Sequence, residues 1–207
     1  MGSSTAATVQ EAIFWQYAGL IAARVHGANW KTRHRAFQMD TFKKLRSSEM
    51  VWSDVTRDQD RYEEELVQKK GPFCVYCERP GSEVPIHHEH MLPRVHGGPG
   101  PNDDFHLWNR VPACRDCNLS KGAKGLYEWK GYEGRHEIPR VAEGRYLKML
   151  NKLHEVRNTA AWGKDRLQVG FCPRCPQSGK AERCPAGGPV KVIEMICAEA
   201  MILHGLT

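Results

Sequence analysis

The sequence predicts a mainly helical protein built around a small zinc-clipped unit. Helical hydrophobic patterns occupy most of the first 70 residues and resume near residue 140. Between them stand two Cys-x-x-Cys pairs, Cys74/Cys77 and Cys114/Cys117. Four thiolates in two such knuckles are typical of a closed tetrahedral zinc site. We therefore expect a helical N-terminal region (1–71), a metal-bound core (72–125) and a helical C-terminal region (126–207).

The composition indicates a soluble globular protein. The chain has 207 residues, of which 41% are hydrophobic and 26% charged, and no apolar run approaches the roughly 20 residues that span a bilayer. The first residues lack the basic and apolar regions of a signal peptide. We expect no membrane partner and a reducing, intracellular location, where the eight cysteines serve as metal ligands and not as disulfides.

Three helices are expected in the N-terminal region. Thr8 and Glu11 form a capping box that begins the first helix, and Gly27 ends it. The second helix covers residues 37–45, and the third runs from Ser53 or Asp54 to Lys69, before Gly71-Pro72. The first helix is expected to bury one face, which consists of Val9, Ile13, Phe14, Tyr17, Ala18, Ile21 and Val25.

A basic segment lies between Arg24 and Arg46. It holds seven Lys or Arg residues and one acid, and aromatic side chains such as Trp30, Phe37 and Phe42 are interleaved with them. Cations that displace phosphate counterions, beside rings on which bases stack, favour nucleic-acid binding. The candidate contacts are Lys31, Arg33 and Arg35. The alternative is a solvated helix face with the aromatic rings turned inward.

The C-terminal region is expected to contain a glycine-rich loop up to Pro139, a helix over residues 140–156 and a last helix over residues 190–203. The 140–156 helix should bury Tyr146, Leu150, Leu153 and Val156. Cys172, Cys175, Cys184 and Cys197 suggest a second zinc site, in which His154 or His204 is an alternative fourth ligand. The same cysteines could instead bind an iron–sulfur cluster or remain unliganded thiols.

The core carries a further motif between its two knuckles. Glu89-His90-x-x-Pro93 is followed by Gly97-Gly98 and Asn109, and Cys114-x-x-Cys117 is followed by Asn118-x-x-Lys121-Gly122. This order and spacing resemble the HNH endonuclease family, whose fold is the ββα-metal unit. The resemblance covers about 50 of the 207 residues. It implies a strand ending near Glu89-His90, a second strand over 109–113 and a helix opening near 115–118.

The fold class implied is thus mainly α with a small β: a zinc-clipped ββα-metal HNH core flanked by N- and C-terminal helices. The residue types also suit phosphodiester hydrolysis. An imidazole is a competent base near neutral pH, so His90 is the candidate general base. Glu89 and Asn118 offer oxygen ligands to a catalytic Mg²⁺ or Mn²⁺ ion. The resemblance implies that Asn109 holds the loop that orients His90.

Further cations and histidines lie near the motif. Lys121, Arg94 and Arg110 are close enough in sequence to contact neighbouring phosphates. His87 and His88 can also serve as base or ligand, but the spacing to Pro93 favours His90, and for them and His96 packing or phosphate contact is expected. Two departures from the common family pattern are Glu in place of Asp at position 89 and Asn in place of His at position 118.

The expected function is a metal-dependent HNH endonuclease that nicks or cuts DNA. The resemblance also implies a cytoplasmic enzyme of bacterial or phage type. The first alternative is a zinc-stabilised nucleic-acid-binding module without catalysis. Another is an RNA-directed nuclease or a subunit with a protein partner for targeting, and a homodimer is one way to cut both strands with one active site per chain.

Overall fold

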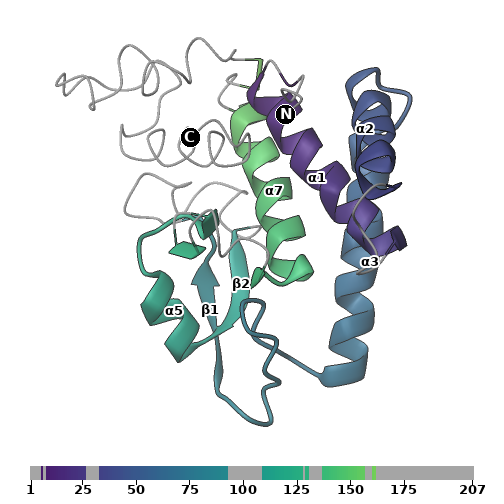
Figure 1. The fold of residues 1–207 in the computed structure, drawn as a ribbon. Coiled ribbons are helices and arrows are strands. Elements are labelled where there is room, and N and C mark those ends of the chain that lie inside the picture. The colour runs from purple at the N-terminus through teal and green to yellow at the C-terminus, as the bar shows by residue number, and fades with distance from the viewer. Residues whose placement is uncertain are drawn as a thin grey trace, which may run out of the picture.

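The computed structural model describes residues 6, 8–26, 33–92, 109–127, 129–130, 137–156 and 160–161. Its helices and strands are α1 (Val9–His26), α2 (Arg33–Arg46), α3 (Trp52–Lys70), β1 (Ile86–His90), β2 (Arg110–Cys114), α5 (Arg115–Lys121) and α7 (Arg140–Val156). Strands β1 and β2 pair antiparallel. Helix α7 lies between the small β unit with α5 on one side and α1, α2 and α3 on the other (Figure 1). The predicted class, mainly α with a small β, is confirmed.

Helix α1 begins at its predicted cap. The N–H of Glu11 donates to Oγ1 of Thr8 at 3.2 Å, which satisfies one of the free donors of the first turn. The predicted apolar face is buried as far as Ala18, and Ala22 is also buried. Val25 is 57% exposed, so its predicted burial is wrong. The buried face ends one turn before the helix does.

The aromatic residues of the basic segment point inward where the structure describes them. Phe42 on α2 is 1% exposed and meets the ring of Trp15 on α1 edge-on, with centroids 5.5 Å apart. Phe37 packs similarly against His26. These contacts join α1 to α2 and agree with the alternative in which the rings serve packing. Lys31 and the side chain of Arg33 lie outside the described residues, and Arg35 is exposed.

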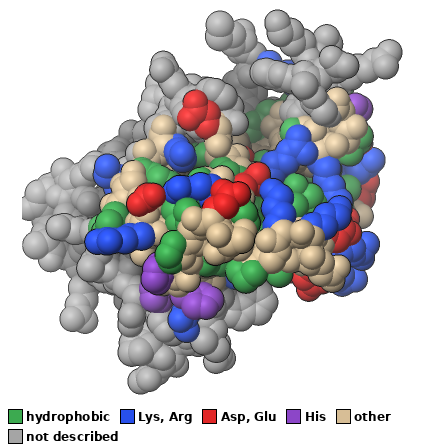
Figure 2. Space-filling view, turned by 90° about the horizontal axis from the view of Figure 1, so that it is seen from below, with side chains coloured by type: hydrophobic (Ala, Val, Ile, Leu, Met, Phe, Trp, Pro, Cys, Tyr) green, Lys and Arg blue, Asp and Glu red, His purple; other side chains and the backbone are tan. Residues whose placement is uncertain are grey.

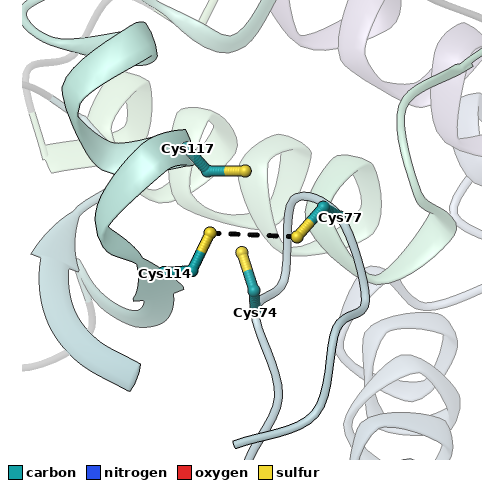
Figure 3. Close-up of side chains that lie close together, drawn as sticks. All are labelled: Cys74, Cys77, Cys114 and Cys117. Atoms are coloured by element: carbon teal, nitrogen blue, oxygen red, sulfur yellow. Dashed lines mark hydrogen bonds between the residues drawn. The ribbon is translucent and has the colours of Figure 1, made fainter. Parts of the chain in front are cut away.

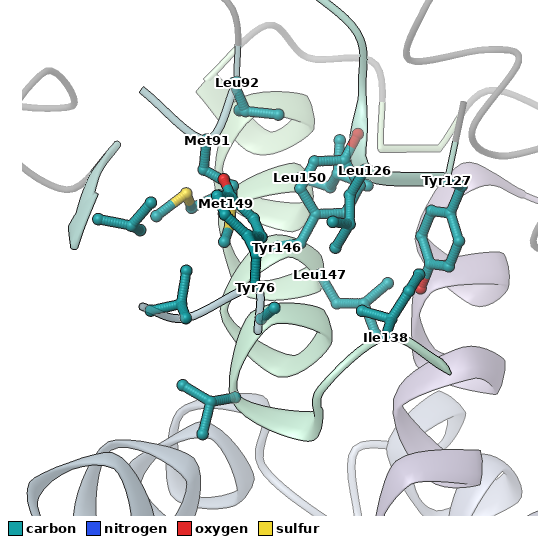
Figure 4. Close-up of a cluster of buried hydrophobic side chains, with 14 of the residues drawn as sticks. Tyr76, Met91, Leu92, Leu126, Tyr127, Ile138, Tyr146, Leu147, Met149 and Leu150 are labelled. Carbon is teal, nitrogen blue, oxygen red and sulfur yellow. The ribbon is translucent and has the colours of Figure 1, made fainter. Parts of the chain in front are cut away.

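One hydrophobic cluster draws on all three expected regions. Tyr146, Leu147 and Leu150 of α7 form its centre, and Leu126 and Tyr127 pack against them (Figure 4). The cluster extends to α1, to the segment around the first knuckle, to the residue after β1 and to β2. Its members there include Ile13, Tyr17, Phe73, Val75, Met91, Val111 and Ala113. The predicted burial of Tyr146, Leu150 and Leu153 is confirmed. The small β unit is therefore anchored on α7.

Ion pairs fasten α3 to α7 outside this cluster. Arg145 donates to Glu63, and Nζ of Lys148 lies 2.6 Å from a carboxylate oxygen of Asp60. Both pairs are partly exposed, so each stabilises the packing only modestly. Among the described helices, none is both long and apolar enough to cross a bilayer.

Candidate nuclease site and zinc centre

Four cysteine side chains converge from the first knuckle, the end of β2 and the first turn of α5 (Figure 3). The Sγ atoms of Cys74, Cys77, Cys114 and Cys117 all lie within 4.8 Å of one another. Those of Cys77 and Cys114 are 3.9 Å apart. Because Zn–S bonds measure about 2.3 Å, the edges of a ZnS₄ tetrahedron measure roughly 3.8 Å. The four thiols are positioned for one closed zinc site, as the sequence predicts.

Backbone hydrogen bonds shape the first knuckle. The N–H of Cys74 donates to the carbonyl of Arg79 at 2.9 Å, and that of Glu78 donates to the carbonyl of Cys74 at 2.8 Å. Glu78 has a φ of 58°, a left-handed conformation that costs a residue with a Cβ about 1 kcal/mol. The N–H of Val75 donates to the carbonyl of Pro112 at 3.0 Å. The knuckle is thereby tied to β2, which ends at Cys114, the first cysteine of the second pair.

Arg79 caps the sulfur cluster. Its Nε lies 3.4 Å from Sγ of Cys77, and its Nη2 lies 3.5 Å from Sγ of Cys114 and 3.1 Å from the Asp116 carboxylate. Burial acts to raise the pKa of Cys77, but the hydrogen bonds with Arg79, Cys74 and Cys117 together outweigh it and lower that pKa to about 7. Arg79 thus offsets part of the negative charge of a zinc tetrathiolate. Its only sequence signal is its place two residues after Cys77.

The pKa values of buried Cys74 and half-buried Cys117 shift in the opposite direction. Burial raises the pKa of Cys74 and that of Cys117. Because zinc binds thiolates, metal binding here must release their protons.

The two strands carry the candidate catalytic residues on opposite faces. Glu89 pairs with Val111, and His90 pairs with Arg110. Successive side chains of a strand point to opposite faces. Glu89 and Val111 are buried on the core face, whereas His90 is half-buried and Arg110 exposed on the other. Directly paired side chains have Cβ atoms roughly 5 Å apart, so Arg110 stands next to His90.

Asn109 holds the segment that follows His90. Its side-chain Oδ1 accepts from the N–H of Leu92 at 2.7 Å, and its Nδ2 donates to the carbonyl of Leu92, also at 2.7 Å. Its own carbonyl accepts from the N–H of Met91 at 2.9 Å. Asn109 is 1% exposed. These three bonds fix the backbone one and two residues beyond the candidate base.

Glu89 belongs to a buried polar cluster. The Tyr76 hydroxyl donates to its Oε1, and Nζ of Lys121 lies 3.4 Å from its Oε2. Burial raises the pKa of Glu89 above 4.5, while the charge of Lys121 and the hydroxyl of Tyr76 partly offset the rise. A carboxylate has about four lone-pair positions, so two partners leave room for more. Its hard oxygen atoms suit Mg²⁺ or Mn²⁺ in chemistry.

Lys121 lies in a different place from the one the sequence suggested. We expected its ammonium to contact phosphate, but its side chain is 0% exposed. It pairs with Glu89 and also donates to the carbonyl of His90 at 3.2 Å. The structure therefore assigns Lys121 to the interior of the unit, where it joins α5 to the end of β1.

Asn118 lies on α5, which packs against both strands. It is half-buried, and its backbone carbonyl accepts from the N–H of Gly122 at 2.9 Å. Its side-chain amide is an oxygen donor suited to the same hard ions as Glu89. Several expected residues lie outside the described part of the chain: Arg94, the Pro93 and Gly97-Gly98 turn, His96, Cys172, Cys175, Cys184, Cys197, His204 and the 190–203 helix.

The face of the molecule that lies at the bottom of Figure 1 carries charges of both signs. Figure 2 shows basic side chains alternating with acidic ones on this face, and a group of histidines at one edge. Ion pairs such as Lys44 with Asp40 and Arg46 with Glu11 also neutralise basic groups on α2. The described basic residues therefore do not form one continuous cationic patch on this face.

A cavity of about 340 Å³ lies apart from this site, between α1, α3 and the start of α7. Tyr17, Tyr62 and Val55 line it together with charged groups of both signs, including Arg24 and Asp58. Arg24 lies over the ring of Tyr62. None of the candidate nuclease residues lines this cavity.

Comparison with known proteins supplies one match. Residues 74–124 match the protein-family model described as HNH endonuclease. No match was found among curated proteins or among solved structures. The matched segment begins at the first zinc cysteine and ends just after α5, and so contains both strands and all four converging thiols. Over residues 74–124 the chain is thus similar to the HNH endonuclease family, and four cysteines of this segment are placed to hold a zinc ion.

Proposed function

We propose that the protein is a metal-dependent endonuclease that hydrolyses DNA phosphodiester bonds. The family match over residues 74–124 carries the proposal. Three local features support it. Asn109 fixes the backbone directly after His90, Arg110 pairs with His90 across the strands, and the zinc cysteines close the unit around them.

In the proposed reaction, His90 removes a proton from a water molecule, and the oxygen of that water forms a bond to phosphorus. The bond from phosphorus to the 3′ oxygen breaks, and the leaving oxygen takes a proton from solvent. The products are a 5′-phosphate and a 3′-hydroxyl. Arg110 lies next to His90 and is exposed, so its guanidinium can neutralise a nonbridging phosphate oxygen during attack.

Glu89 and Asn118 are the residues that would hold the divalent ion. When bound, Mg²⁺ or Mn²⁺ supplies positive charge at the phosphate and at the leaving oxygen. Lys121 on α5 pairs with the carboxylate of Glu89 and so draws it toward this helix, on which Asn118 also lies.

The second candidate function is a zinc-stabilised nucleic-acid-binding module without turnover. One observation favours it: Glu89 is only 5% exposed and already engages a hydroxyl and an ammonium. If those bonds persist in the presence of substrate and ion, Glu89 is a structural residue.

Nicking of supercoiled plasmid separates the two candidates. We expect zinc-loaded wild-type protein to nick with Mg²⁺ or Mn²⁺ and to stop when EDTA is added. His90→Ala should lower the rate by at least about 100-fold, the contribution typical of a general base, and should retain its zinc. Binding in a gel-shift assay with no nicking under any divalent ion would favour the module. Parallel assays with single-stranded DNA and RNA test the alternative substrates.

A further inference from the structure

Tyr76 links the first zinc knuckle to the candidate site. It stands between Cys74 and Cys77 in the sequence, and its hydroxyl donates to Oε1 of Glu89 on β1. Tyr76 and Glu89 are 13 positions apart in the sequence, so the contact links the first knuckle directly to β1. The backbone bond from Val75 to Pro112 links the knuckle to β2 instead. A residue of the zinc-binding turn thus contacts the carboxylate proposed to hold the catalytic ion.

The ring of Tyr76 has little freedom to move. Its side chain is 3% exposed, and it meets the ring of Trp129 edge-on, with centroids 5.3 Å apart and planes at 85°. The indole N–H of Trp129 donates to Oγ of Ser120 on α5 at 3.0 Å.

The backbone of Tyr76 is held by the knuckle itself. The neighbouring N–H groups of Cys74 and Val75 are bonded to Arg79 and to Pro112. A zinc ion held by Cys74 and Cys77 would fix the backbone on both sides of Tyr76, and with it the direction from which the hydroxyl approaches Glu89. Lys121 approaches the other carboxylate oxygen from α5. The Tyr76 hydroxyl and the Lys121 ammonium therefore hold the Glu89 carboxylate from two sides. The last side-chain torsion of a glutamate is otherwise free to take a broad range of angles.

We propose that Tyr76 is a positioning residue that orients Glu89 for the divalent ion, so that the first zinc knuckle is a working part of the nuclease site and not only a staple. This inference depends on the proposed function, because it takes Glu89 as an ion ligand. The hydroxyl acts through the carboxylate and does not itself contact substrate. Removal of a group that hydrogen-bonds a metal ligand in this way typically changes metal affinity by about 10- to 100-fold.

Tyr76→Phe is the direct test, because it deletes the hydroxyl and keeps the ring. Tyr127→Phe is its matched control. The Tyr127 hydroxyl also donates to a buried carboxylate, Oε1 of Glu143 at 2.6 Å, and its side chain is 0% exposed. Both substitutions therefore remove the same kind of bond from the same hydrophobic cluster, but only one of them touches Glu89.

Three quantities are measured on full-length, zinc-loaded protein: zinc content, the temperature of thermal unfolding and the dissociation constant for Mn²⁺. The last is obtained from the electron paramagnetic resonance signal of free Mn²⁺ during a titration. We expect both variants to retain zinc and to unfold at similar temperatures. Tyr76→Phe should weaken Mn²⁺ binding by at least about 10-fold, whereas Tyr127→Phe should not change it. Glu89→Gln assigns the Mn²⁺ binding to this site by abolishing that binding, so that the signal of the free ion is no longer reduced by the protein.

Nicking rates measured over a range of Mn²⁺ concentrations add a second readout. Tyr76→Phe should require more Mn²⁺ for half-maximal rate. Equal Mn²⁺ affinity in the two Tyr→Phe variants overturns the inference, as does loss of zinc from Tyr76→Phe alone, which would make the hydroxyl structural. Mn²⁺ binding that depends on Tyr76 and Glu89, in a protein that never nicks, would support the inference and reject the proposed nuclease function.

Discussion

Replacing Lys121 with methionine removes the buried cation that pairs with Glu89 and leaves a side chain of similar length in its place. The side chains of Lys121 and Glu89 are 0% and 5% exposed. Removing one partner of such a buried pair costs about 3–5 kcal/mol, because the remaining charge is left without compensation. The Tyr76 hydroxyl stays bonded to Glu89. We therefore expect the lower end of that range, about 3 kcal/mol.

The double variant Lys121→Met/Glu89→Gln isolates the charge effect. It removes both charges, and the glutamine carbonyl can still accept from Tyr76. We expect it to lie within about 1 kcal/mol of wild type, since replacing both partners of a buried pair is often nearly neutral. Lys124→Met is the matched control, because Lys124 is exposed and close in sequence; a surface substitution should change stability by less than about 0.5 kcal/mol.

The cost of Lys121→Met should depend on pH in a defined direction. Burial raises the pKa of Glu89 above 4.5, and Lys121 partly offsets the rise. Without Lys121 the pKa in the folded state rises further, so the folded protein favours the protonated carboxyl. The destabilisation is therefore small near the unfolded-state pKa and grows as pH increases through the folded-state value.

Urea unfolding of zinc-loaded protein at about pH 5.5 and about pH 8 measures both effects. A cost of less than about 1 kcal/mol for Lys121→Met at the higher pH would contradict the role of Lys121 as the partner of a buried charge. A double variant as unstable as the single one would contradict that role as well.

Three further predictions concern the zinc site, the exposed face and the core. Cys114→Ser should lose the bound zinc and lower the unfolding temperature, measured by elemental analysis and calorimetry, because a structural zinc contributes directly to folding; full zinc occupancy would contradict the four-cysteine site. Arg110→Ala should reduce the slope of log K for DNA against log[salt] by about 1. The control Arg57→Ala, on the exposed face of α3, should leave the slope unchanged; equal slopes in both would exclude a phosphate contact at Arg110. Leu147→Ala should cost about 2–5 kcal/mol in urea unfolding, since Leu147 is fully buried, against less than about 0.5 kcal/mol for Leu119→Ala, which is 69% exposed in wild type; similar costs would contradict the core arrangement.

The sequence predicted the features that depend on local chemistry. The Thr8 cap begins α1, and Pro139 precedes an α7 that covers the residues expected. The spacing of the cysteines predicted four converging thiols. Each of these follows from neighbours within a few positions of the chain, where capping, periodicity and ligand spacing act.

Features made by long-range packing were not predicted. Leu126 and Tyr127 lie in a glycine-rich stretch without periodicity, yet both are fully buried against α7. A lysine is expected at the surface, but Lys121 is buried because Glu89 and the His90 carbonyl compensate it. The bond between Tyr76 and Glu89 depends on how the knuckle meets the sheet, which no local pattern specifies.

The central claim is that a zinc-held hairpin presents His90 to a phosphate as the base. Single-turnover nicking rates of His90→Ala and His88→Ala, with zinc content measured on the same samples, test it most directly. Both residues lie on the same face of β1, and His88, two positions before His90, is exposed. We predict that His90→Ala loses at least about 100-fold in rate while His88→Ala stays close to wild type, both with full zinc. Equal rates in the two variants, or a loss confined to His88→Ala, would contradict it.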